Sequence, residues 1–499
     1  MSISLLLDMA ASNDPDRCAV ACGETQWTAA ELSVLSQGGA AVLTGSGARS
    51  LAYVGTGGHL LPLLLFAAAG AAVPFTPLNY RLGAEALGAL IARLDAPLLV
   101  CDDEYYDIVV REVSGSGVTV LRSPKFLALA TSAEPAAVDA DPEQVAVVLF
   151  TSGTTSTPKA VELTHNNLVS YITGTVDFAS AAPRDAALVC VPPYHIAGVG
   201  AAMSHLYAGR KVVYLPTFDA AAWVAAVRRE SVTTATVVPT MLARIVAELE
   251  RTGATLPSLR TLAYGGSKVA LPLLRTALRL LPATGFVNAY GLTETSSTIA
   301  VLGPDDHRAA LAADDPALAR RLGSVGTPVP GIELQIRDEN GTVLPAGATG
   351  ELYVRGAQVS GRYTGIGSVL DANGWFPTRD VAVLDSDGFL YIGGRSDDTI
   401  IRGGENIAPA EIEDVLVEHP QVREVAVIGI DDVQWGQIIV AVVVPGGDHA
   451  PDPEELRGFA RAGLRGSRTP DRVVFRDSLP ATPTGKILRR DLVAEYSGH

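Results

Sequence analysis

The chain of 499 residues predicts an α/β fold with a large N-terminal domain of two parallel-type sheets with helices plus a small antiparallel β unit, and a mobile α+β C-terminal domain. As far as about Gly323, short apolar runs alternate with turn residues or helical patterns, which is typical of parallel sheets with crossover helices. Beyond Gly323 the apolar runs are separated by hairpin turns such as Asn340-Gly341 and Asp387-Gly388. The length itself exceeds one ordinary domain.

The parallel-type region begins with a strand at 50–54, followed by the most apolar segment of the chain, 60–73. This segment is too short to span a bilayer and is interrupted by Pro62 and Gly70, so it predicts a buried helix that leads into a strand at 71–75. The pattern continues with a helix at 84–94 and strands at 97–101, 145–150, 187–191, 211–215, 234–238, 261–263 and 285–288.

The antiparallel unit is expected to contain strands at 329–338, 350–355, 381–385 and 388–393. A second boundary lies near 393–398, and beyond it we expect a helix at 411–419, strands at 425–430 and 438–444, and a helix at 453–464. About a hundred residues of this pattern can form a domain of their own. The sequence therefore predicts domains at 1–396 and 397–499.

Composition narrows the function classes. Apolar residues make up 48% of the chain, which is typical of a globular protein. The formal net charge is −16, so the chain has no surplus of basic residues and is not expected to be a general nucleic-acid binder. The four cysteines are few and scattered, which suits a reducing compartment and predicts a cytoplasmic protein. We expect no signal peptide, no integral membrane segment and no zinc site.

The segment 149–160 follows an apolar strand and consists of small hydroxyl residues, one glycine, one proline and Lys159. Backbone N–H groups, hydroxyls and a mobile cation together suit a polyanion, so this loop predicts a site for the β- and γ-phosphates of a nucleotide. The Walker A spacing is absent. The alternative is a polar surface turn after a core strand.

Six segments then occur in an order that resembles the adenylate-forming superfamily of acyl-CoA synthetases, peptide-synthetase adenylation domains and luciferases. They are 151–159, Tyr290-Gly291-Leu292-Thr293-Glu294-Thr295, Trp375-Phe376-Pro377-Thr378-Arg379-Asp380, Gly394-Arg395-Ser396-Asp397-Asp398, Gly403-Gly404-Glu405-Asn406-Ile407 and Pro483-Thr484-Gly485-Lys486-Ile487. The resemblance implies two half-reactions. A carboxylate attacks the α-phosphate of ATP to give an acyl-adenylate and pyrophosphate, and a thiol then displaces AMP while the C-terminal domain rotates.

The resemblance also implies roles for individual residues. Catalytic roles fall to Lys486, Glu294, Lys159 and His195, and Mg²⁺ is expected at Glu294 and Thr151 because hard cations take oxygen ligands. ATP or AMP is expected at Thr151, Ser152, Gly153, Thr154, Thr155, Gly265, Gly266, Ser267, Asn288, Ala289, Tyr290, Gly291, Thr293, Asp380, Ile392 and Arg395. Structural alternatives are an N-cap acid for Glu294, a core tyrosine for Tyr290, a solvated lysine for Lys486 and a core histidine for His195.

Domain rotation and the second substrate have their own candidates. Asp397 is the expected hinge, although Ser-Asp-Asp would also suit a solvated turn. Gly403, Gly404 and Trp435 resemble contacts with coenzyme A. The acyl pocket is expected at Ala197, Gly198, Val199, Val238, Met241, Tyr264 and Thr298. Small or apolar residues predict a fatty, aromatic or bulky ring acid, with Lys268 as the one cation nearby that could meet a second carboxylate.

The sequence departs from the family pattern at three places, and the third of them opens an alternative. Ser156 and Ala160 replace glycines, Arg379 replaces a glycine before Asp380, and 466–468 replaces an aromatic-lysine pair near the CoA nucleotide. The resemblance as a whole implies an ATP-dependent acyl-CoA ligase that uses ATP, Mg²⁺ and coenzyme A. The alternative is an adenylating enzyme that passes its product to a carrier protein or a partner thiol-transferring enzyme; a luciferase-like oxygenase and a non-catalytic protein of the same fold are more distant possibilities.

Overall fold

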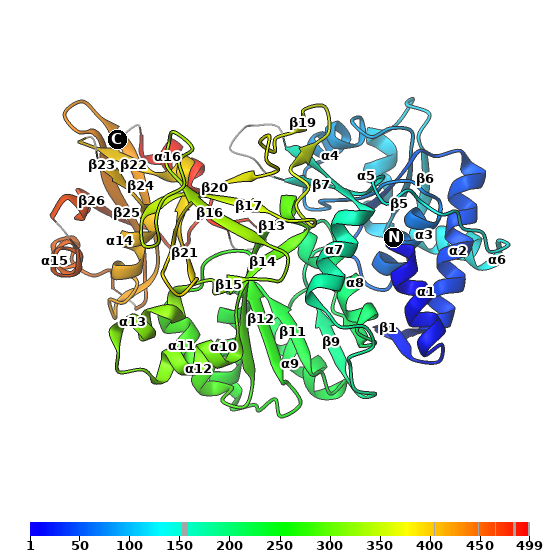
Figure 1. Ribbon diagram of the computed structural model, residues 1–499, viewed down its shortest axis with the longest axis horizontal. Helices are drawn as coiled ribbons and strands as arrows, with labels where there is room; N and C mark the ends of the chain where they lie inside the picture. The colour runs from blue at the N-terminus through cyan, green and yellow to red at the C-terminus, as the bar shows by residue number, and fades with distance from the viewer. Residues whose placement is uncertain (152–157, 404, 448, 465, 483–485, 498–499) are drawn as a thin grey trace.

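The computed structural model describes the chain except residues 152–157, 404, 448, 465, 483–485 and 498–499. Figure 1 shows two large sheets with their helices, a smaller sheet beside them and a separate C-terminal unit at the opposite end from the N-terminal helices. This is the predicted α/β architecture, and it is confirmed.

The first large sheet has eight strands in the order β19-β18-β8-β7-β4-β3-β5-β6. Its central strands are parallel and carry crossover helices, whereas β7 and β8 form an antiparallel hairpin around the predicted phosphate loop. The strands are β3 (Ser50–Val54), β4 (Phe75–Leu78), β5 (Pro97–Cys101), β6 (Thr119–Arg122), β7 (Val145–Thr151), β8 (Lys159–Thr164), β18 (Arg362–Tyr363) and β19 (Gly367–Ser368). The helices of this region are α1 (Ser4–Asn13), α2 (Ala29–Ser46), α3 (Leu60–Gly70), α4 (Ala84–Ile91), α5 (Asp103–Glu112), α6 (Ser123–Ser132) and α7 (His165–Thr175).

The second large sheet has nine strands in the order β15-β14-β13-β12-β11-β9-β10-β1-β2. The strands are β1 (Cys18–Cys22), β2 (Thr25–Thr28), β9 (Ala186–Val189), β10 (Lys211–Tyr214), β11 (Thr234–Val237), β12 (Thr261–Gly265), β13 (Gly285–Leu292), β14 (Ser297–Leu302) and β15 (Thr327–Pro328). Its helices are α8 (Ile196–Tyr207), α9 (Ala220–Arg229), α10 (Pro239–Thr252), α11 (Leu271–Leu280), α12 (Pro304–Ala312) and α13 (Pro316–Ala319). Neighbouring residues of β9 enter different cores: Val189 joins the cluster that includes α8, and Leu188 joins the cluster that includes α9, α10 and α11.

The small antiparallel sheet has the order β16-β17-β20-β21 and contains β16 (Glu333–Arg337), β17 (Thr349–Arg355), β20 (Phe376–Leu384) and β21 (Leu390–Arg395). A short 3₁₀ turn at Ser396–Asp398 follows it. The C-terminal sheet then contains β22 (Ile400–Arg402), β23 (Glu405–Ile407), β24 (Val422–Asp432), β25 (Gly436–Pro445) and β26 (Arg472–Phe475), with helices α14 (Pro409–Leu416), α15 (Pro453–Gly463) and α16 (Arg489–Tyr496). The boundary between residues 396 and 397 remains a prediction.

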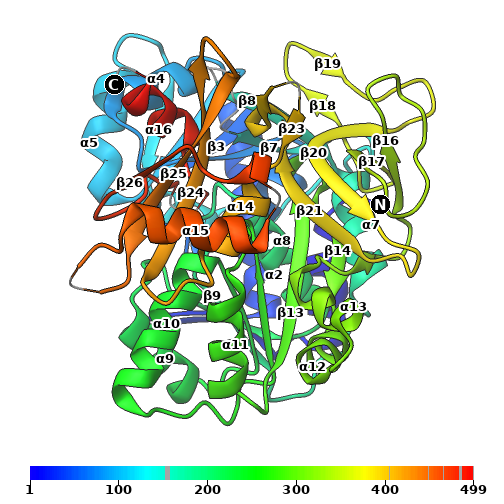
Figure 2. The same ribbon diagram turned by 90° about the vertical axis from the view of Figure 1, so that its left-hand side faces the viewer.

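The C-terminal unit lies against the rest of the chain on the side of the nine-stranded sheet that carries α10 and α11. Figure 2 shows α14 and α15 above these two helices. Two ion pairs join the units there: Lys268 Nζ lies 2.5 Å from Asp414 Oδ2, and Arg275 Nη1 lies 3.4 Å from Glu418 Oε1.

Most predicted elements are present with shifted ends, and one prediction is wrong. The apolar segment forms α3, whose residues are all buried, and among the described residues no helix is long and apolar enough to cross a membrane. The strand expected at 71–75 instead begins at Phe75. The chain turns first, because Ala72 has a φ of +52° and Pro74 has no N–H to donate.

Candidate active site

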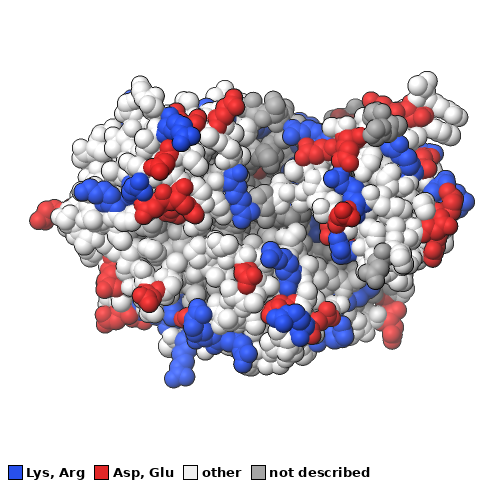
Figure 3. Space-filling model, turned by 180° about the vertical axis from the view of Figure 1, so that it is seen from behind, with Lys and Arg blue, Asp and Glu red and all other residues white. Residues whose placement is uncertain are grey.

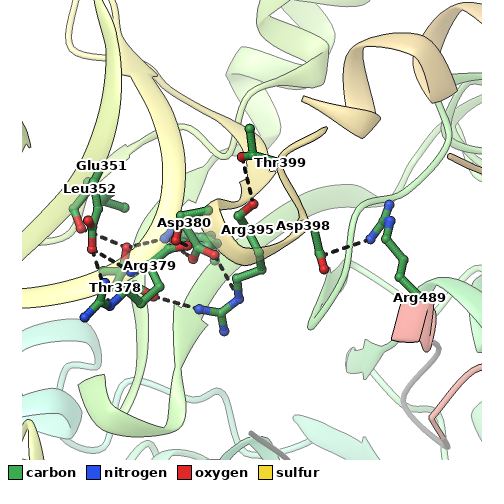
Figure 4. Close-up of polar contacts among 11 residues, drawn as sticks. Glu351, Leu352, Thr378, Arg379, Asp380, Arg395, Asp398, Thr399 and Arg489 are labelled. Carbon is green, nitrogen blue, oxygen red and sulfur yellow. Dashed lines mark hydrogen bonds and ion pairs between the residues drawn. The ribbon is translucent and has the colours of Figure 1, made fainter. Parts of the chain in front are cut away.

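Three side chains from three strands meet between the nine-stranded sheet and the small antiparallel sheet. Figure 4 shows two of them, Asp380 and Arg395. Tyr290, on β13, donates its phenolic hydrogen to Oδ2 of Asp380 at 2.5 Å. Arg395, at the end of β21, places Nε 3.2 Å from Asp380 Oδ1 and donates from Nη1 to the Thr378 carbonyl at 2.7 Å. The sequence predicted all three as nucleotide contacts, and the structure brings them together.

A bulge in β20 aims Asp380 at this site. Glu351 of β17 pairs with Val381 and Tyr353 pairs with Pro377, so Thr378, Arg379 and Asp380 stand opposite Leu352 alone. The hydroxyl of Thr378 donates to the Leu352 carbonyl at 2.8 Å and accepts from the Asp380 N–H at 3.1 Å. Bulges of this kind redirect side chains next to functional sites.

The carboxyl of Asp380 is almost completely buried, and its electrostatics follow from that burial. Loss of water raises its pKa above the ordinary value, while the charge of Arg395, the hydrogen bond from Tyr290 and the charge of Lys486 oppose the rise. A buried carboxyl held by a guanidinium and a phenol is a rigid acceptor, which suits the diol of a ribose.

The glycines predicted beside the base are required by the packing of β12 and β13. A Cβ at Gly265 would lie 2.2 Å from the Ala289 carbonyl oxygen, and Gly266 has a φ of +84°. Only glycine meets both conditions without strain. Ser267 follows in the same turn, while the side chain of Asn288 donates to the Ser324 carbonyl at 3.1 Å.

A second group forms around Glu294, which lies in a short turn after β13. The hydroxyl of Tyr363, on β18, donates to Glu294 Oε1 at 2.9 Å. The ammonium of Lys159, at the start of β8, lies 5.5 Å from the centre of the Tyr363 ring. Lys159 and Glu294 are thus gathered around one tyrosine that the sequence analysis did not assign a role.

The donors in this group fit a magnesium ion that is shared with phosphates. The hydrogen bond from Tyr363 to Glu294 Oε1 orients the Glu294 carboxylate. Thr151 lies at the end of β7, where it pairs with Lys159 of β8. No group of three or more His, Cys, Asp or Glu side chains suitable for a metal exists among the described residues. One carboxylate with the remaining positions filled by phosphate and water is the usual way in which proteins hold Mg²⁺.

Lys486, in the C-terminal unit, lies within electrostatic range of Asp380 and Arg395. Its backbone N–H donates to Thr482 Oγ1 at 3.0 Å, and its carbonyl accepts from the Thr482 N–H at 2.7 Å. The residue as a whole is exposed, yet the surrounding protein displaces water from its ammonium. This desolvation and the charge of Arg395 lower the pKa of Lys486, whereas the charges of Asp398 and Asp380 partly oppose the change. A loop near the chain end therefore places its lysine within range of the Asp380 site.

Arg489 lies three residues after Lys486 and joins α14 to the turn that precedes β22. Its Nη2 donates to Glu413 Oε1 at 2.6 Å, and its Nη1 lies 3.5 Å from Asp398 Oδ2 in the turn that contains the predicted hinge, Asp397 (Figure 4). Sequence reasoning missed Arg489 and Tyr363, because neither stands in a motif and each acquires its contact only through tertiary pairing.

His195 stands at the N-terminal end of α8, with its ring centre 4.6 Å from that of Tyr194. Burial, with a smaller effect of Arg81, lowers the pKa of His195 to about 4. Its Nε2 is buried and has no hydrogen-bond partner within the described part of the chain. A neutral imidazole with an unused nitrogen can serve a substrate, whereas a core histidine normally has a partner.

The residues expected at the acyl pocket are divided between two cores. Val199 belongs to the cluster around α8, with Ala197 packed against it, whereas Val238, Met241 and Tyr264 belong to the cluster beneath α10 and α11. The hydroxyl of Tyr264 is hydrogen-bonded to His307 Nε2 at 2.8 Å. A single pocket lined by these residues together with Gly198 and Thr298 remains a prediction. Lys268, the cation expected nearby, is paired with Asp414 instead.

Two of the expected coenzyme A contacts touch each other in the C-terminal sheet. The N–H of Gly403 donates to the Trp435 carbonyl at 2.7 Å, and a Cβ at Gly403 would lie 3.3 Å from the Trp435 ring. Ser152, Gly153, Thr154, Thr155 and Gly404 lie outside the described residues. The other nucleotide contacts that were expected, Ala289, Gly291, Thr293 and Ile392, lie on or next to β13 and β21.

Comparison with known proteins decides the family. The family model described as "AMP-binding enzyme" matches residues 7–364, and the one described as "AMP-binding enzyme C-terminal domain" matches residues 411–486. The chain belongs to the AMP-binding enzyme family. It is an adenylate-forming enzyme of the acyl-CoA synthetase branch, as the order of motifs indicated.

Relatives of this AMP-binding enzyme have several acyl acceptors and substrates. It is 35% identical over 487 residues to a feruloyl-CoA synthase of an Amycolatopsis species, with 96% of each chain covered. It is 32% identical over 459 residues to the fatty acid–[acyl-carrier-protein] ligase ScoC of Streptomyces coeruleorubidus, covering 90% of this chain and 87% of the relative. The crystal structure of ATP-bound MatB from Rhodopseudomonas palustris superposes with a TM-score of 0.90 at 26% identity, covering 100% of this chain and 99% of MatB.

Proposed function

We propose that this AMP-binding enzyme activates a hydrophobic carboxylic acid with ATP and Mg²⁺ and then transfers the acyl group to coenzyme A. The observation that carries this proposal is the contact of Tyr290, Asp380 and Arg395, which come from three strands. The charges of Asp380 and Arg395 also act on Lys486 of the C-terminal unit. Positioned cations and dipoles are what an adenylation needs, because charge moves between phosphate oxygens and no nucleophilic side chain takes part.

In the first half-reaction, Asp380 and Arg395 hold the ribose and Tyr290 lies against the adenine. The carboxylate of the acid attacks the α-phosphate, and the electron pair of the broken bond leaves on pyrophosphate. Lys486 stabilises the charge that develops at the α-phosphate, Lys159 binds the outer phosphates, and neutral His195 gates the carboxylate site. Glu294 and Thr151 would hold a magnesium ion, which would supply further charge neutralisation when bound. In the second half-reaction the C-terminal domain turns about Asp397 and presents Gly403, Gly404 and Trp435 to the thiol of coenzyme A.

Fatty, aromatic and bulky ring acids are the proposed substrates, because the candidate pocket residues are small or apolar. The pairing of Lys268 with Asp414 argues against a second carboxylate on the acid, since no unpaired lysine remains at that turn. The feruloyl-CoA synthase and fatty-acid ligase relatives support acids of this apolar kind.

A carrier protein or partner enzyme as the acyl acceptor is the second candidate. The segment that replaces the aromatic-lysine pair forms a short 3₁₀ turn in which Arg468 Nε lies 3.0 Å from Glu411 Oε2, so this guanidinium is engaged within its own domain. The relative ScoC acylates a carrier protein according to its name.

The test is pyrophosphate release across a panel of fatty, aromatic and polycyclic acids, each with and without coenzyme A. Multiple turnovers that depend on coenzyme A and yield acyl-CoA would establish the ligase and its substrate class. A single burst that coenzyme A does not extend would favour the carrier or partner enzyme. No release with any acid would contradict both.

A further inference from the structure

A small cavity lies between α1 and the C-terminal end of α8. Its volume is about 90 Å³, several times the 10–15 Å³ that one water molecule needs. Most of its lining is apolar, and small alanines make up a large part of it. The larger apolar residues of the lining are Phe178, Leu206 and Tyr207.

Two arginines also line this cavity, Arg17 before β1 and Arg210 before β10. The Nε atoms of both are buried and have no hydrogen-bond partner in the part of the chain that the structure describes. Arg17 donates from Nη2 to the carbonyls of Ala182 and Asp185, at 3.2 and 3.0 Å, which holds its guanidinium in place. Buried polar groups normally have a partner, so the two Nε–H groups indicate an acceptor from outside the chain.

The carboxylates of this region do not supply that acceptor. Asp185 is engaged by other groups, because its Oδ1 pairs with Arg260 and its Oδ2 accepts from the Ala182 N–H at 3.1 Å. Asp14 lines the cavity but is exposed, and within the described residues it forms no ion pair with either arginine. The described lining therefore carries two positive charges and one negative charge.

The positive charge of the cavity is a local feature. Figure 3 shows basic and acidic side chains interspersed over the face opposite to that of Figure 1, with no broad basic surface on its described part. The net charge of the whole chain is −16. An anion would therefore be selected by the two arginines themselves and not by the general field of the protein.

The cavity is remote from the candidate active site. Strands β1, β9 and β10 run parallel, and Arg17 and Arg210 directly precede two of them, whereas His195 follows the end of β9. The two arginines therefore stand at the opposite edge of the nine-stranded sheet from His195. Helix α8 separates them further, because His195 precedes its first residue and Tyr207 is its last, and 12 residues of helix span about 18 Å.

We propose that this cavity is a second ligand site, which binds a small organic carboxylate. Its oxygens accept hydrogen bonds from Arg17 and Arg210, because a guanidinium matches the planar geometry of a carboxylate. Its apolar body lies against Phe178 and Tyr207, whose ring centres are 5.2 Å apart. An inorganic anion would satisfy the arginines and leave the apolar lining without a partner. This site goes beyond the proposed function and does not depend on it.

The experiment measures the dissociation constant of butyrate by ligand-observed NMR with the full-length protein. Arg17→Met and Arg210→Met should each raise this constant about tenfold or more, because a hydrogen-bonded charge pair is lost. Arg184→Met is the matched control, since Arg184 is an exposed arginine next to Asp185 that does not line the cavity. It should bind butyrate as the wild type does. Butan-1-ol, which lacks the charge, should not displace butyrate, and inorganic phosphate should do so only at concentrations about tenfold higher or more.

Ala10→Leu tests the cavity without removing a charge. Ala10 lies on α1 and lines the cavity, and leucine is a good helix former whose larger side chain would occupy part of the space. This variant should also weaken butyrate binding about tenfold, and thermal unfolding checks that each variant is folded. Because both arginines are retained, the result does not depend on the stability of the arginine variants.

Three outcomes would overturn the inference. Wild-type affinity in A10L and in the folded arginine variants would place butyrate elsewhere, for example in the proposed acyl pocket. Phosphate that binds as tightly as butyrate through the same arginines would mean a site for inorganic anions. No binding of butyrate by the wild type would mean that water alone fills the cavity. None of these outcomes bears on pyrophosphate release, which tests the proposed function separately.

Discussion

The hydroxyl of Tyr290 donates to Asp380 Oδ2 and thereby joins the nine-stranded sheet to the small antiparallel sheet. The two residues are 90 positions apart in the sequence. The hydrogen bond orients a buried carboxyl whose other oxygen faces Arg395. Ribose binding at this site should therefore depend on both partners of the bond.

Tyr290→Phe removes the hydrogen bond and leaves the ring. A lost hydrogen bond to a charged acceptor costs about 1.5–3 kcal/mol, so the dissociation constant for AMP should rise about tenfold or more. Isothermal titration calorimetry with AMP measures this. The control is Tyr391→Phe on β21, which removes a hydroxyl 3.3 Å from Asp385 Oδ2 and should bind AMP normally. Equal binding by Y290F and the wild type would show that the bond does not serve the nucleotide.

Lys486→Ala should separate the half-reactions. The variant should lose acid-dependent pyrophosphate release by about two to three orders of magnitude, because a preorganised charge at the α-phosphate is lost. It should still convert a supplied acyl-adenylate and coenzyme A into thioester. Lys125→Ala, on α6, is the matched control. Equal loss of both activities would contradict a role for Lys486 in adenylation alone.

The pH dependence of adenylation should reflect the lowered pKa of Lys486. The protonated ammonium is the active form, so the rate should fall as pH rises through a pKa below the ordinary lysine value. Rates of pyrophosphate release between pH 7 and 10 measure this. Lys486→Arg should remove the alkaline limb, because arginine stays protonated. An identical alkaline limb in K486R would assign the titration to another group.

The ion pair between Lys268 and Asp414 should bias the C-terminal unit toward the observed orientation. Both side chains are about half exposed, so the contribution is about 0.2–1 kcal/mol. Lys268→Glu should slow adenylation about twofold to fivefold, and adding Asp414→Lys should restore the rate. The effect should shrink at high salt. Failure of the double reversal to restore the rate would mean that the pair does not set the orientation.

Asp397→Pro tests the hinge. Proline restricts φ, so it should hinder the backbone change of a domain rotation more than either fixed orientation. Thioester formation should therefore slow more than adenylation in single-turnover assays. Asp397→Ala is the control and should affect neither step strongly. A proline at Asp387 would not serve as the control, because it would disturb a hairpin turn. Unchanged turnover in D397P would place the hinge elsewhere.

Local pattern was sufficient for much of this protein. Short apolar runs that alternate with turn residues or helical patterns predicted the parallel sheets, because a strand that is buried on both faces consists of consecutive apolar residues. Gly265 and Gly266 were predicted as nucleotide contacts from their place in the sequence, whereas the close approach of Ala289 to Gly265 arises from the pairing of β12 with β13. The prediction of a strand at 71–75 is wrong, because the apolar residues continue through a turn that the conformation of Ala72 and the ring of Pro74 produce.

The sequence by itself determined the class of fold, the family and the residue types available for phosphate chemistry, since these depend on periodicity and on the order of short motifs. Only the tertiary structure decided that Tyr363 orients Glu294, that Lys268 is paired with Asp414, and that Arg489 is paired with Glu413. These contacts join residues that are far apart in the chain. They arise from how sheets and domains pack together, and no local periodicity encodes that.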